Sequence, residues 1–236
     1  MSEGNRTPWV AAIGGGVIGA VLTAGALVLA GPPLFGERLV REALIAEPEM
    51  LVDAGQALRD KQFAETLQPL RASVERPFFS SWKGAEKPEV TLTYFFDYAC
   101  GYCRQSNPDI ERLLKEDKGL RVVYRELPIL GPESVAAARL SLAASKAGKF
   151  SQFHDTLYAA GRPGPDTIAL AAKAAGIPAQ PADDPAQEAE LRANMTLAQQ
   201  LGATGTPLFI VGDRVMNAAV GYDALKEAVE AARKKG

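Results

Sequence analysis

The only two cysteines in this 236-residue chain, Cys100 and Cys103, stand three positions apart. The run before them, residues 89–96, is rich in β-branched and aromatic side chains and predicts a buried strand. The residues after them, as far as Leu114, have the apolar spacing of a helix. A cysteine pair between a strand and a helix favours an α/β fold with a redox-active dithiol at the start of the helix.

The two sulfur atoms are expected to have different roles. A helix N-terminus presents free N–H groups and positive potential, which stabilise a thiolate. Cys100 lies at that terminus, so we expect it to exchange disulfides with the substrate. Cys103 lies one turn further along, where its thiol can attack the mixed disulfide and resolve it.

Three other uses of the pair compete with redox chemistry. A structural disulfide within one helical turn closes a small loop, which adds little chain-entropy stabilisation. A zinc site needs about two further ligands, and His154 is the only histidine. Linear Cu(I) needs only two thiolates, so a copper-binding module stays open as an alternative function.

Composition narrows the function classes. A net charge of −2 leaves no basic surface for a nucleic acid, and 47% hydrophobic with 23% charged residues is typical of a globular protein. Gly14, Gly16 and Gly19 form the pattern G-x-G-x-x-G, but no amphipathic helix follows them, as a dinucleotide site requires. We interpret these glycines as close-packing positions in an apolar helix. No cofactor or metal is expected.

The N-terminal segment predicts attachment to a membrane. Residues 7–36 carry no charged side chain, and Trp9–Ala30 as a helix would span roughly 33 Å. Residues 1–36 are therefore expected to form a transmembrane anchor or an uncleaved signal, with cleavage after Ala30 as the alternative. The charge balance favours a cytoplasmic N-terminus. We expect a single-pass inner-membrane protein with its catalytic domain in the periplasm, or a soluble periplasmic protein after cleavage.

Residues 37–75 are expected to form a helical stalk, in which Pro48 marks a helix start. Apolar side chains recur there at near-helical spacing: Val40, Leu44, Leu51, Leu58, Phe63, Leu67 and Leu70. Two interpretations are open, because amphipathicity does not name the partner. The stalk packs on the main domain, or it buries its apolar stripe against copies of itself.

Residues 76–236 are expected to form one catalytic domain. A connecting segment at 76–88 precedes, in order, a strand at 89–96, a helix from 100, a strand at 121–127, helices from 132 to 201, strands at 207–211 and 214–216, and a helix at 223–235. This order predicts an α/β sheet of the thioredoxin type. An all-helical insertion at about 132–203 interrupts it.

Three segments closely resemble the DsbA-like thiol–disulfide oxidoreductases. They are the active-site run Phe95–Cys103 (FFDYACGYC), the loop and strand Gly205–Asp213 (GTPLFIVGD) and the insertion helix Phe150–Tyr158 (FSQFHDTLY). The likeness extends from about Pro88 to the C-terminus. Val40–Leu58 resembles the N-terminal helical segment of the ScsC-like branch, whose known members include oligomeric disulfide isomerases and copper-tolerance proteins.

The resemblance implies roles for the residues around Cys100. It implies a cis peptide bond before Pro207, which faces the Cys100 sulfur and leaves a backbone edge open for the substrate. It implies that Thr206 sets the side-chain chemistry at that edge. The dipeptide between the cysteines is Gly101-Tyr102 instead of Pro-His, so we expect a less stabilised thiolate than in the strongest oxidants.

The chain departs from the family at an acidic position. Many relatives carry an acid six residues before the first cysteine, where this chain has Tyr94. Asp97 and Glu126 are candidate substitutes that would accept the proton of Cys103, and the alternative is that they are ordinary capping or surface acids. His154 is expected to be structural, because its neighbours in the sequence are aromatic and aliphatic at packing spacing.

These features predict an extracytoplasmic thiol–disulfide oxidoreductase. Thr206, the Gly-Tyr dipeptide and the stalk favour an isomerase or reductase over the alternative, a disulfide-donating oxidase. The expected partners are cysteine-containing substrate proteins, a membrane redox protein that donates or accepts electrons, and copies of the chain itself. No nucleic-acid partner is expected.

Overall fold

The structure is a computed structural model that describes residues 36–180 and 183–235. The transmembrane helix expected in residues 1–36 lies, apart from Gly36, outside these residues. Among the helices that are described, none has the length and apolar character needed to cross a bilayer. The chain divides into two compact units, one that ends at Ala57 and one formed by Leu58–Gly236.

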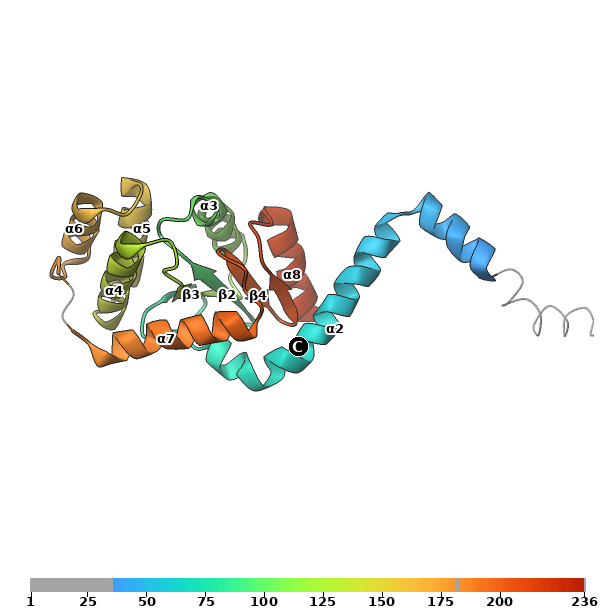
Figure 1. Cartoon of the computed structure of the whole chain (residues 1–236), viewed down its shortest axis with the longest axis horizontal. Helices are drawn as coiled ribbons and strands as arrows, with labels where there is room; N and C mark the ends of the chain where they lie inside the picture. The colour runs from blue at the N-terminus through green and yellow to red at the C-terminus, as the bar shows by residue number, and fades with distance from the viewer. Residues whose placement is uncertain (1–35, 181–182, 236) are drawn as a thin grey trace, which may run out of the picture. The chain divides into compact units, whose positions relative to one another are not determined.

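A five-stranded sheet forms the centre of the unit that begins at Leu58 (Figure 1). Its strands, in spatial order, are β1 (Trp82–Gly84), β3 (Leu120–Glu126), β2 (Val90–Phe96), β4 (Leu208–Val211) and β5 (Arg214–Met216). Only β2 and β3 are parallel, and the other neighbouring pairs are antiparallel. Because β2 and β3 run in the same direction, their last residues, Phe96 and Glu126, lie side by side at one edge of the sheet.

The structure confirms the four strands that the sequence predicts. It also contains a fifth strand, β1, that the sequence did not predict. Residues 76–88 were expected to be a connecting segment, and that prediction is wrong for Trp82–Gly84, which pair with the free edge of β3. Three residues are too few to show an alternating pattern. Gly84 ends the strand with a φ of 99°, and a Cβ there would collide with the Leu120 carbonyl oxygen.

Helices cover both faces of the sheet (Figure 1). They are α2 (Glu49–Glu75), α3 (Gly101–Glu116), α4 (Pro132–Lys146), α5 (Phe150–Ala160), α6 (Pro165–Ala175), α7 (Pro185–Gln200) and α8 (Tyr222–Lys235). The run from α4 to α7 confirms the predicted all-helical insertion. One hydrophobic core lies on the side of α3 and α8 and includes Tyr94 and Phe96, whereas Phe95 points into a second core on the other side, with α7 and the end of α2.

The second half of α2 belongs to the sheet-containing unit. Leu67 and Val74 are buried there in the same core as Phe95. The buried Arg125 side chain on β3 donates hydrogen bonds to the carbonyl oxygens of Ser73, Val74 and Arg76. A guanidinium in this position satisfies carbonyls that a helix end leaves without partners. The packing interpretation of the stalk therefore applies to residues 58–75.

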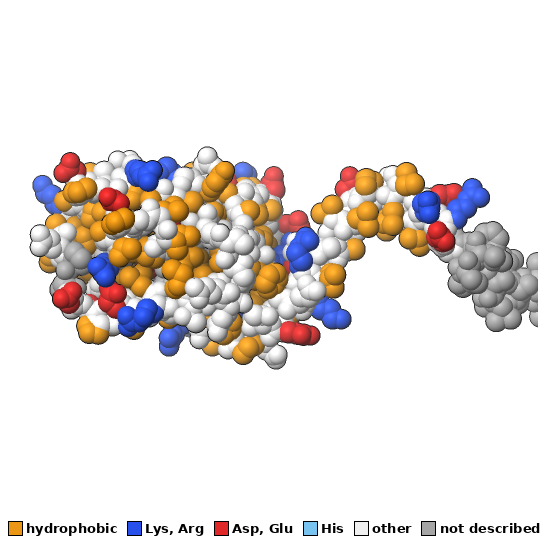
Figure 2. All heavy atoms as spheres, viewed as in Figure 1, with side chains coloured by type: hydrophobic (Ala, Val, Ile, Leu, Met, Phe, Trp, Pro, Cys, Tyr) orange, Lys and Arg blue, Asp and Glu red, His pale blue; other side chains and the backbone are white. Residues whose placement is uncertain are grey.

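The unit that ends at Ala57 has a different surface. Its described part consists of a helix over residues 36–46 and the first residues of α2, which begins at Glu49, directly after Pro48. Its large hydrophobic side chains are exposed, among them Leu39, Val40, Ile45, Met50, Leu51 and Val52. Figure 2 shows hydrophobic side chains along the surface of this segment. The interpretation of the stalk as a self-association element concerns this part of the chain.

Candidate dithiol site

Cys100 forms the N-cap of α3, directly after a turn that leads out of β2. The turn closes with a hydrogen bond from the Cys100 N–H to the Asp97 carbonyl at 3.0 Å, and the helix begins with one from the Arg104 N–H to the Cys100 carbonyl at 3.1 Å. Only 6% of Cys100 is exposed. Its sulfur donates a hydrogen bond to the carbonyl oxygen of Thr206 at 3.2 Å.

Thr206 and Pro207 reach the cysteines because of the sheet pairing. Strand β4 begins at Leu208 and pairs with β2, with Leu208 opposite Phe95, so the residues just before β4 lie beside the end of β2. The Thr206–Pro207 peptide bond is cis, as the resemblance implies. The side chain of Thr206 also lies close enough to the Cys103 thiol to counter part of the rise in its pKa. One residue therefore contacts both cysteine side chains.

Cys103 lies in a different environment from Cys100. It is completely buried in the core on the α3 side of the sheet. Burial raises the pKa of its thiol to about 12, against the effect of hydrogen bonds from the Asp97 backbone and from the side chains of Tyr94 and Thr206. In the reduced protein, Cys103 is thus the protonated, inaccessible member of the pair.

The carboxylate of Asp97 ties together the two loops at this edge of the sheet. It accepts hydrogen bonds from the Ala99 N–H at 2.8 Å, the Ile129 N–H at 2.8 Å, the Leu130 N–H at 3.0 Å and the Ser134 hydroxyl at 2.6 Å. The geometry therefore places this carboxylate as a loop clamp. The contact between Asp97 and the Cys103 sulfur comes from the backbone.

The clamped loops expose apolar side chains near Cys100. Ile129 and Leu130 are both exposed, and so is Tyr102 in the first turn of α3. Gly101, beside Tyr102, has open space where a Cβ would stand. We call Tyr102, Ile129 and Leu130 the apolar rim of the site.

Glu126 takes part in a buried polar network. The Ser141 hydroxyl donates to its Oε1 at 2.7 Å, Ser141 and Tyr98 share a hydrogen bond at 2.8 Å, and the Tyr98 hydroxyl lies 3.2 Å from Nδ1 of His154. The other carboxyl oxygen, Oε2, has no hydrogen-bond partner within the described part of the protein. Burial raises the pKa of Glu126 to about 8, so the carboxyl is mostly protonated at neutral pH.

His154 has the structural role expected of it. It is buried among the rings of Phe96, Tyr124, Phe150 and Tyr158. Burial, and secondarily the charge of Lys83, lowers its pKa well below the ordinary value, so the imidazole is neutral. Across residues 36–180 and 183–235, no three or more His, Cys, Asp or Glu side chains are grouped in a way that could hold a metal ion.

Two residues at the site were not singled out as functional by the sequence. Tyr94 was noted only as a position without an acid, yet its hydroxyl donates to the Cys103 carbonyl at 3.2 Å. Arg104 donates to the carbonyls of Tyr158 and Gly161 and thereby joins the start of α3 to the end of α5. The only signal in the sequence for either residue is its position within six residues of a cysteine, which does not specify a contact.

Comparisons with known proteins agree with this geometry. The model of the DSBA-like thioredoxin domain family matches residues 91–230. A periplasmic thioredoxin-like protein from Salmonella enterica serovar Typhimurium is 31% identical with a TM-score of 0.64, covering 70% of this chain and 96% of its own. A thioredoxin-like oxidoreductase from Silicibacter pomeroyi is 36% identical with a TM-score of 0.58. The match covers 65% of this chain and 91% of that protein. ScsC from Proteus mirabilis, in a transitional conformation, is 27% identical with a TM-score of 0.67. The match covers 85% of this chain and 94% of that protein.

Two curated proteins match over a shorter stretch. They are the Na(+)/H(+) antiporters NhaA 3 of Salinispora tropica and NhaA 1 of Salinispora arenicola, each 34% identical over 79 residues. The match covers 33% of this chain and 12% of each antiporter. The chain thus spans about an eighth of the length of these relatives.

The first prediction concerns the reactivity of the two thiols. Alkylation of the reduced, folded protein with iodoacetamide near neutral pH is expected to modify Cys100 and spare Cys103, because Cys103 is fully buried and its pKa is raised to about 12. Mass spectrometry of peptides gives the site of modification. After unfolding, both cysteines should react equally, which serves as the control. Equal modification in the folded state would contradict the assignment.

The second prediction concerns the pH dependence of stability. The pKa of Glu126 is raised to about 8 in the folded protein, whereas an unfolded glutamate titrates near pH ~4.3. Its contribution to stability is therefore complete below the unfolded pKa and is lost as the pH rises through the folded pKa. The free energy of unfolding should fall between these two values, and Glu126→Gln should remove that fall.

Urea denaturation at a series of pH values measures the effect. The matched control is Glu133→Gln, which alters an exposed carboxyl near the same edge of the sheet and should keep the wild-type pH dependence. If Glu126→Gln and wild type have the same pH dependence, Glu126 is not the buried acid responsible.

Proposed function

The chain belongs to the DSBA-like thioredoxin domain family, and on that basis we propose that it exchanges disulfides with cysteine-containing proteins outside the cytoplasm, mainly as an isomerase or reductase. The observation that carries the proposal is the placement of Thr206. Its carbonyl oxygen accepts a hydrogen bond from the Cys100 sulfur at 3.2 Å, and its side chain lies close enough to Cys103 to act on the pKa of that thiol. A polypeptide edge is thereby held directly beside the more exposed sulfur.

The proposed chemistry starts from the reduced dithiol. The Cys100 thiolate attacks one sulfur of a substrate disulfide, a mixed disulfide forms, and the other substrate sulfur leaves as a thiolate. In isomerisation, that or another substrate thiolate forms a new substrate disulfide and releases Cys100, so no net electrons are transferred. In reduction, Cys103 attacks Cys100, the substrate leaves as a thiolate, and the dithiol becomes a disulfide that a membrane electron donor must reduce again.

The surroundings of Cys100 support non-native proteins as substrates. The apolar rim formed by Tyr102, Ile129 and Leu130 is exposed to solvent, and Asp97 fixes two of these residues to the turn before Cys100. Exposed apolar side chains beside a reactive group suit segments whose own apolar residues are not yet buried. In this proposal Pro207, which has no N–H to pair with neighbouring strands, keeps the adjoining backbone edge open for such a segment.

The difference between the two thiols supports isomerase over oxidase. In disulfide donation Cys103 must leave as a thiolate, and a thiol with a pKa near 12 is a poor leaving group. The same thiol is rarely ionised at neutral pH, so its attack on a mixed disulfide is also slow. A long-lived mixed disulfide gives the substrate time to rearrange. Thr206 before Pro207 and the Gly101-Tyr102 dipeptide favour the same direction.

We propose the periplasm as the location, with the N-terminal segment as an inner-membrane anchor or a cleaved signal. The support is the uncharged run in residues 7–36 and the periplasmic source of a 31%-identical relative. The domain organisation proposed from the sequence has an anchor at 1–36, a stalk at 37–75 and a catalytic domain at 76–236. Because Phe63, Leu67, Leu70 and Val74 pack in the core of the unit that begins at Leu58, the separable part of this stalk ends near Ala57.

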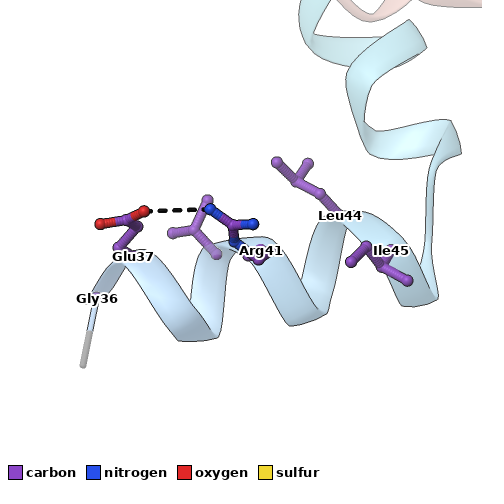
Figure 3. A pocket seen from close by; sticks show the side chains of 6 residues that line it. Gly36, Glu37, Arg41, Leu44 and Ile45 are labelled. Carbon is purple, nitrogen blue, oxygen red and sulfur yellow. Dashed lines mark hydrogen bonds and ion pairs between the residues drawn. The ribbon is translucent and has the colours of Figure 1, made fainter.

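We also propose that this separable part joins copies of the chain. Figure 3 shows the open hollow on the helix over residues 36–46, which is lined by Gly36, Glu37, Val40, Arg41, Leu44 and Ile45. Glu37 and Arg41 form an ion pair at its border, 3.3 Å apart. The side chain of Ile45 is 74% exposed, and burial of a large aliphatic side chain stabilises by roughly 1.5–3 kcal/mol. An apolar surface of this kind suits a second copy of the same segment.

The third prediction tests the exchange reaction. In Cys103→Ser, the mixed disulfide formed at Cys100 has no resolving thiol, so disulfide-linked complexes with other proteins should accumulate in cells. Non-reducing electrophoresis detects them, and reductant should release them. The matched control, Cys100→Ser, should form none. If Cys103→Ser forms no complexes and instead only loses bound Cu(I), the chain is a metal-binding module and the proposal is wrong.

The fourth prediction tests self-association. Residues 36–236 should sediment as an oligomer at tens of micromolar, roughly where several buried leucines per chain can hold copies together. Leu51→Lys places a charge in the proposed interface and should yield the monomer. Leu170→Lys changes a similarly exposed leucine on α6 and should leave the oligomer intact. A monomeric wild type would contradict the self-association proposal and weaken the argument for an isomerase.

A further inference from the structure

The Tyr94 hydroxyl lies against the resolving cysteine. Tyr94 is fully buried in β2, and its hydroxyl donates a hydrogen bond to the carbonyl oxygen of Cys103 at 3.2 Å. The Tyr94 hydroxyl also lies close enough to the Cys103 thiol for each group to shift the pKa of the other. A single hydroxyl therefore contacts the backbone of Cys103 and lies beside its sulfur.

The position of this hydroxyl is fixed by packing. The Tyr94 ring stacks on Phe209 with a centroid distance of 4.9 Å and an interplanar angle of 14°, and it also contacts Phe96 and Tyr124 at 5.3 and 5.8 Å. Phe209 belongs to β4, which directly follows Pro207. The strand before the cysteines and the strand after Pro207 thus hold the phenol together.

The phenol acts as a hydrogen-bond donor to a thiolate and not as a proton acceptor. Burial, followed by the nearby Tyr158, raises the pKa of Tyr94 well above its usual value, so the hydroxyl stays neutral. It carries one hydrogen. While Cys103 is a thiol, its S–H can donate to the phenol oxygen, and the phenol hydrogen points to the Cys103 carbonyl. Once Cys103 ionises, that hydrogen can turn to the sulfur.

The other groups near Cys103 are Cys100 at the start of α3, the Asp97 backbone after β2, Tyr158 on α5 and Thr206 before β4. Of these, the Asp97 backbone and the Tyr158 hydroxyl do not offer this change of partner. The Asp97 contact is a backbone one and is fixed in place. The Tyr158 hydroxyl donates to the Asp97 carbonyl at 3.3 Å. The Cys103 carbonyl, for its part, still faces the N–H four residues along the helix when Tyr94 turns away.

We propose that the Tyr94 hydroxyl is the switching donor that stabilises the Cys103 thiolate during resolution and so sets how long the mixed disulfide lasts. This inference rests on the proposed exchange function. In the step concerned, Cys103 gives its proton to water, its thiolate attacks the Cys100 sulfur, and the bond from Cys100 to the substrate breaks. The substrate leaves as a thiolate and takes up a proton from water, so protons and electrons balance.

The experiment uses a nitrobenzoate disulfide that releases one coloured thiolate at each step. Reduced protein should release the first thiolate in a phase whose rate depends on reagent concentration, as Cys100 attacks the reagent. It should release the second in a concentration-independent phase, as Cys103 attacks Cys100. Tyr94→Phe should slow only the second phase, by about tenfold, which is the size expected for losing one hydrogen bond to a charged group.

Two further proteins separate a donor role from a packing role. Tyr124→Phe removes a neighbouring buried hydroxyl and should leave both phases as in wild type. Fluorotyrosine at position 94 alone keeps the ring shape but is a stronger hydrogen-bond donor, so it should speed the second phase. If Tyr94→Phe does not fold, the fluorotyrosine protein alone tests the donor role of Tyr94.

The outcomes distinguish this inference from the function on which it rests. A wild type without the first phase would overturn the exchange function itself. A normal first phase together with an unchanged second phase in the Tyr94 variants, or an equal slowing in Tyr124→Phe, would overturn only the role of Tyr94.

Discussion

The hydrogen bond between the Cys100 sulfur and the Thr206 carbonyl oxygen joins two segments that are 106 positions apart in the chain. It depends on the antiparallel pairing of β2 with β4, because β2 delivers the cysteines to the edge of the sheet and β4 is preceded by Thr206 and Pro207. Helix α3, strand β3 and the helices from α4 to α7 lie between these strands in the sequence, and they pack around the sheet without separating β2 from β4. The site therefore exists only when the whole domain is folded.

This arrangement gives the two thiols different surroundings and different chemical roles. Cys100 stands at the helix N-terminus beside a backbone edge and an apolar rim, whereas Cys103 is enclosed in the core and has its pKa raised by burial. The high pKa of Cys103 makes it a poor leaving group in disulfide donation, which supports the proposed direction of exchange. The Asp97 carboxylate holds the surrounding loops, and in our proposal the Tyr94 hydroxyl stabilises the thiolate of the buried sulfur.

The order of the strands and helices and the residues of the dithiol site could be predicted from the sequence, because local sequence patterns specify them. The strands around the cysteines have strong β-branched and aromatic runs, and the Cys100–Cys103 spacing with a Thr-Pro pair before a later strand identified the family. Contacts between distant residues could not be predicted in this way. Nothing in the sequence indicates that Asp97 caps the turn at Ile129, that three residues at Trp82 join the sheet edge, or that α2 changes near Ala57 from an exposed to a packed helix.

The reactivation of ribonuclease with scrambled disulfides tests the central claim most directly, since recovery requires repeated exchange on a non-native protein. The reduced wild type is expected to accelerate recovery, and Cys103→Ser should retain part of this activity, because rearrangement needs only the attacking sulfur. Cys100→Ser should have none. If the wild type does not accelerate recovery, or if Cys100→Ser is as active as wild type, disulfide exchange through Cys100 is not the function of this site.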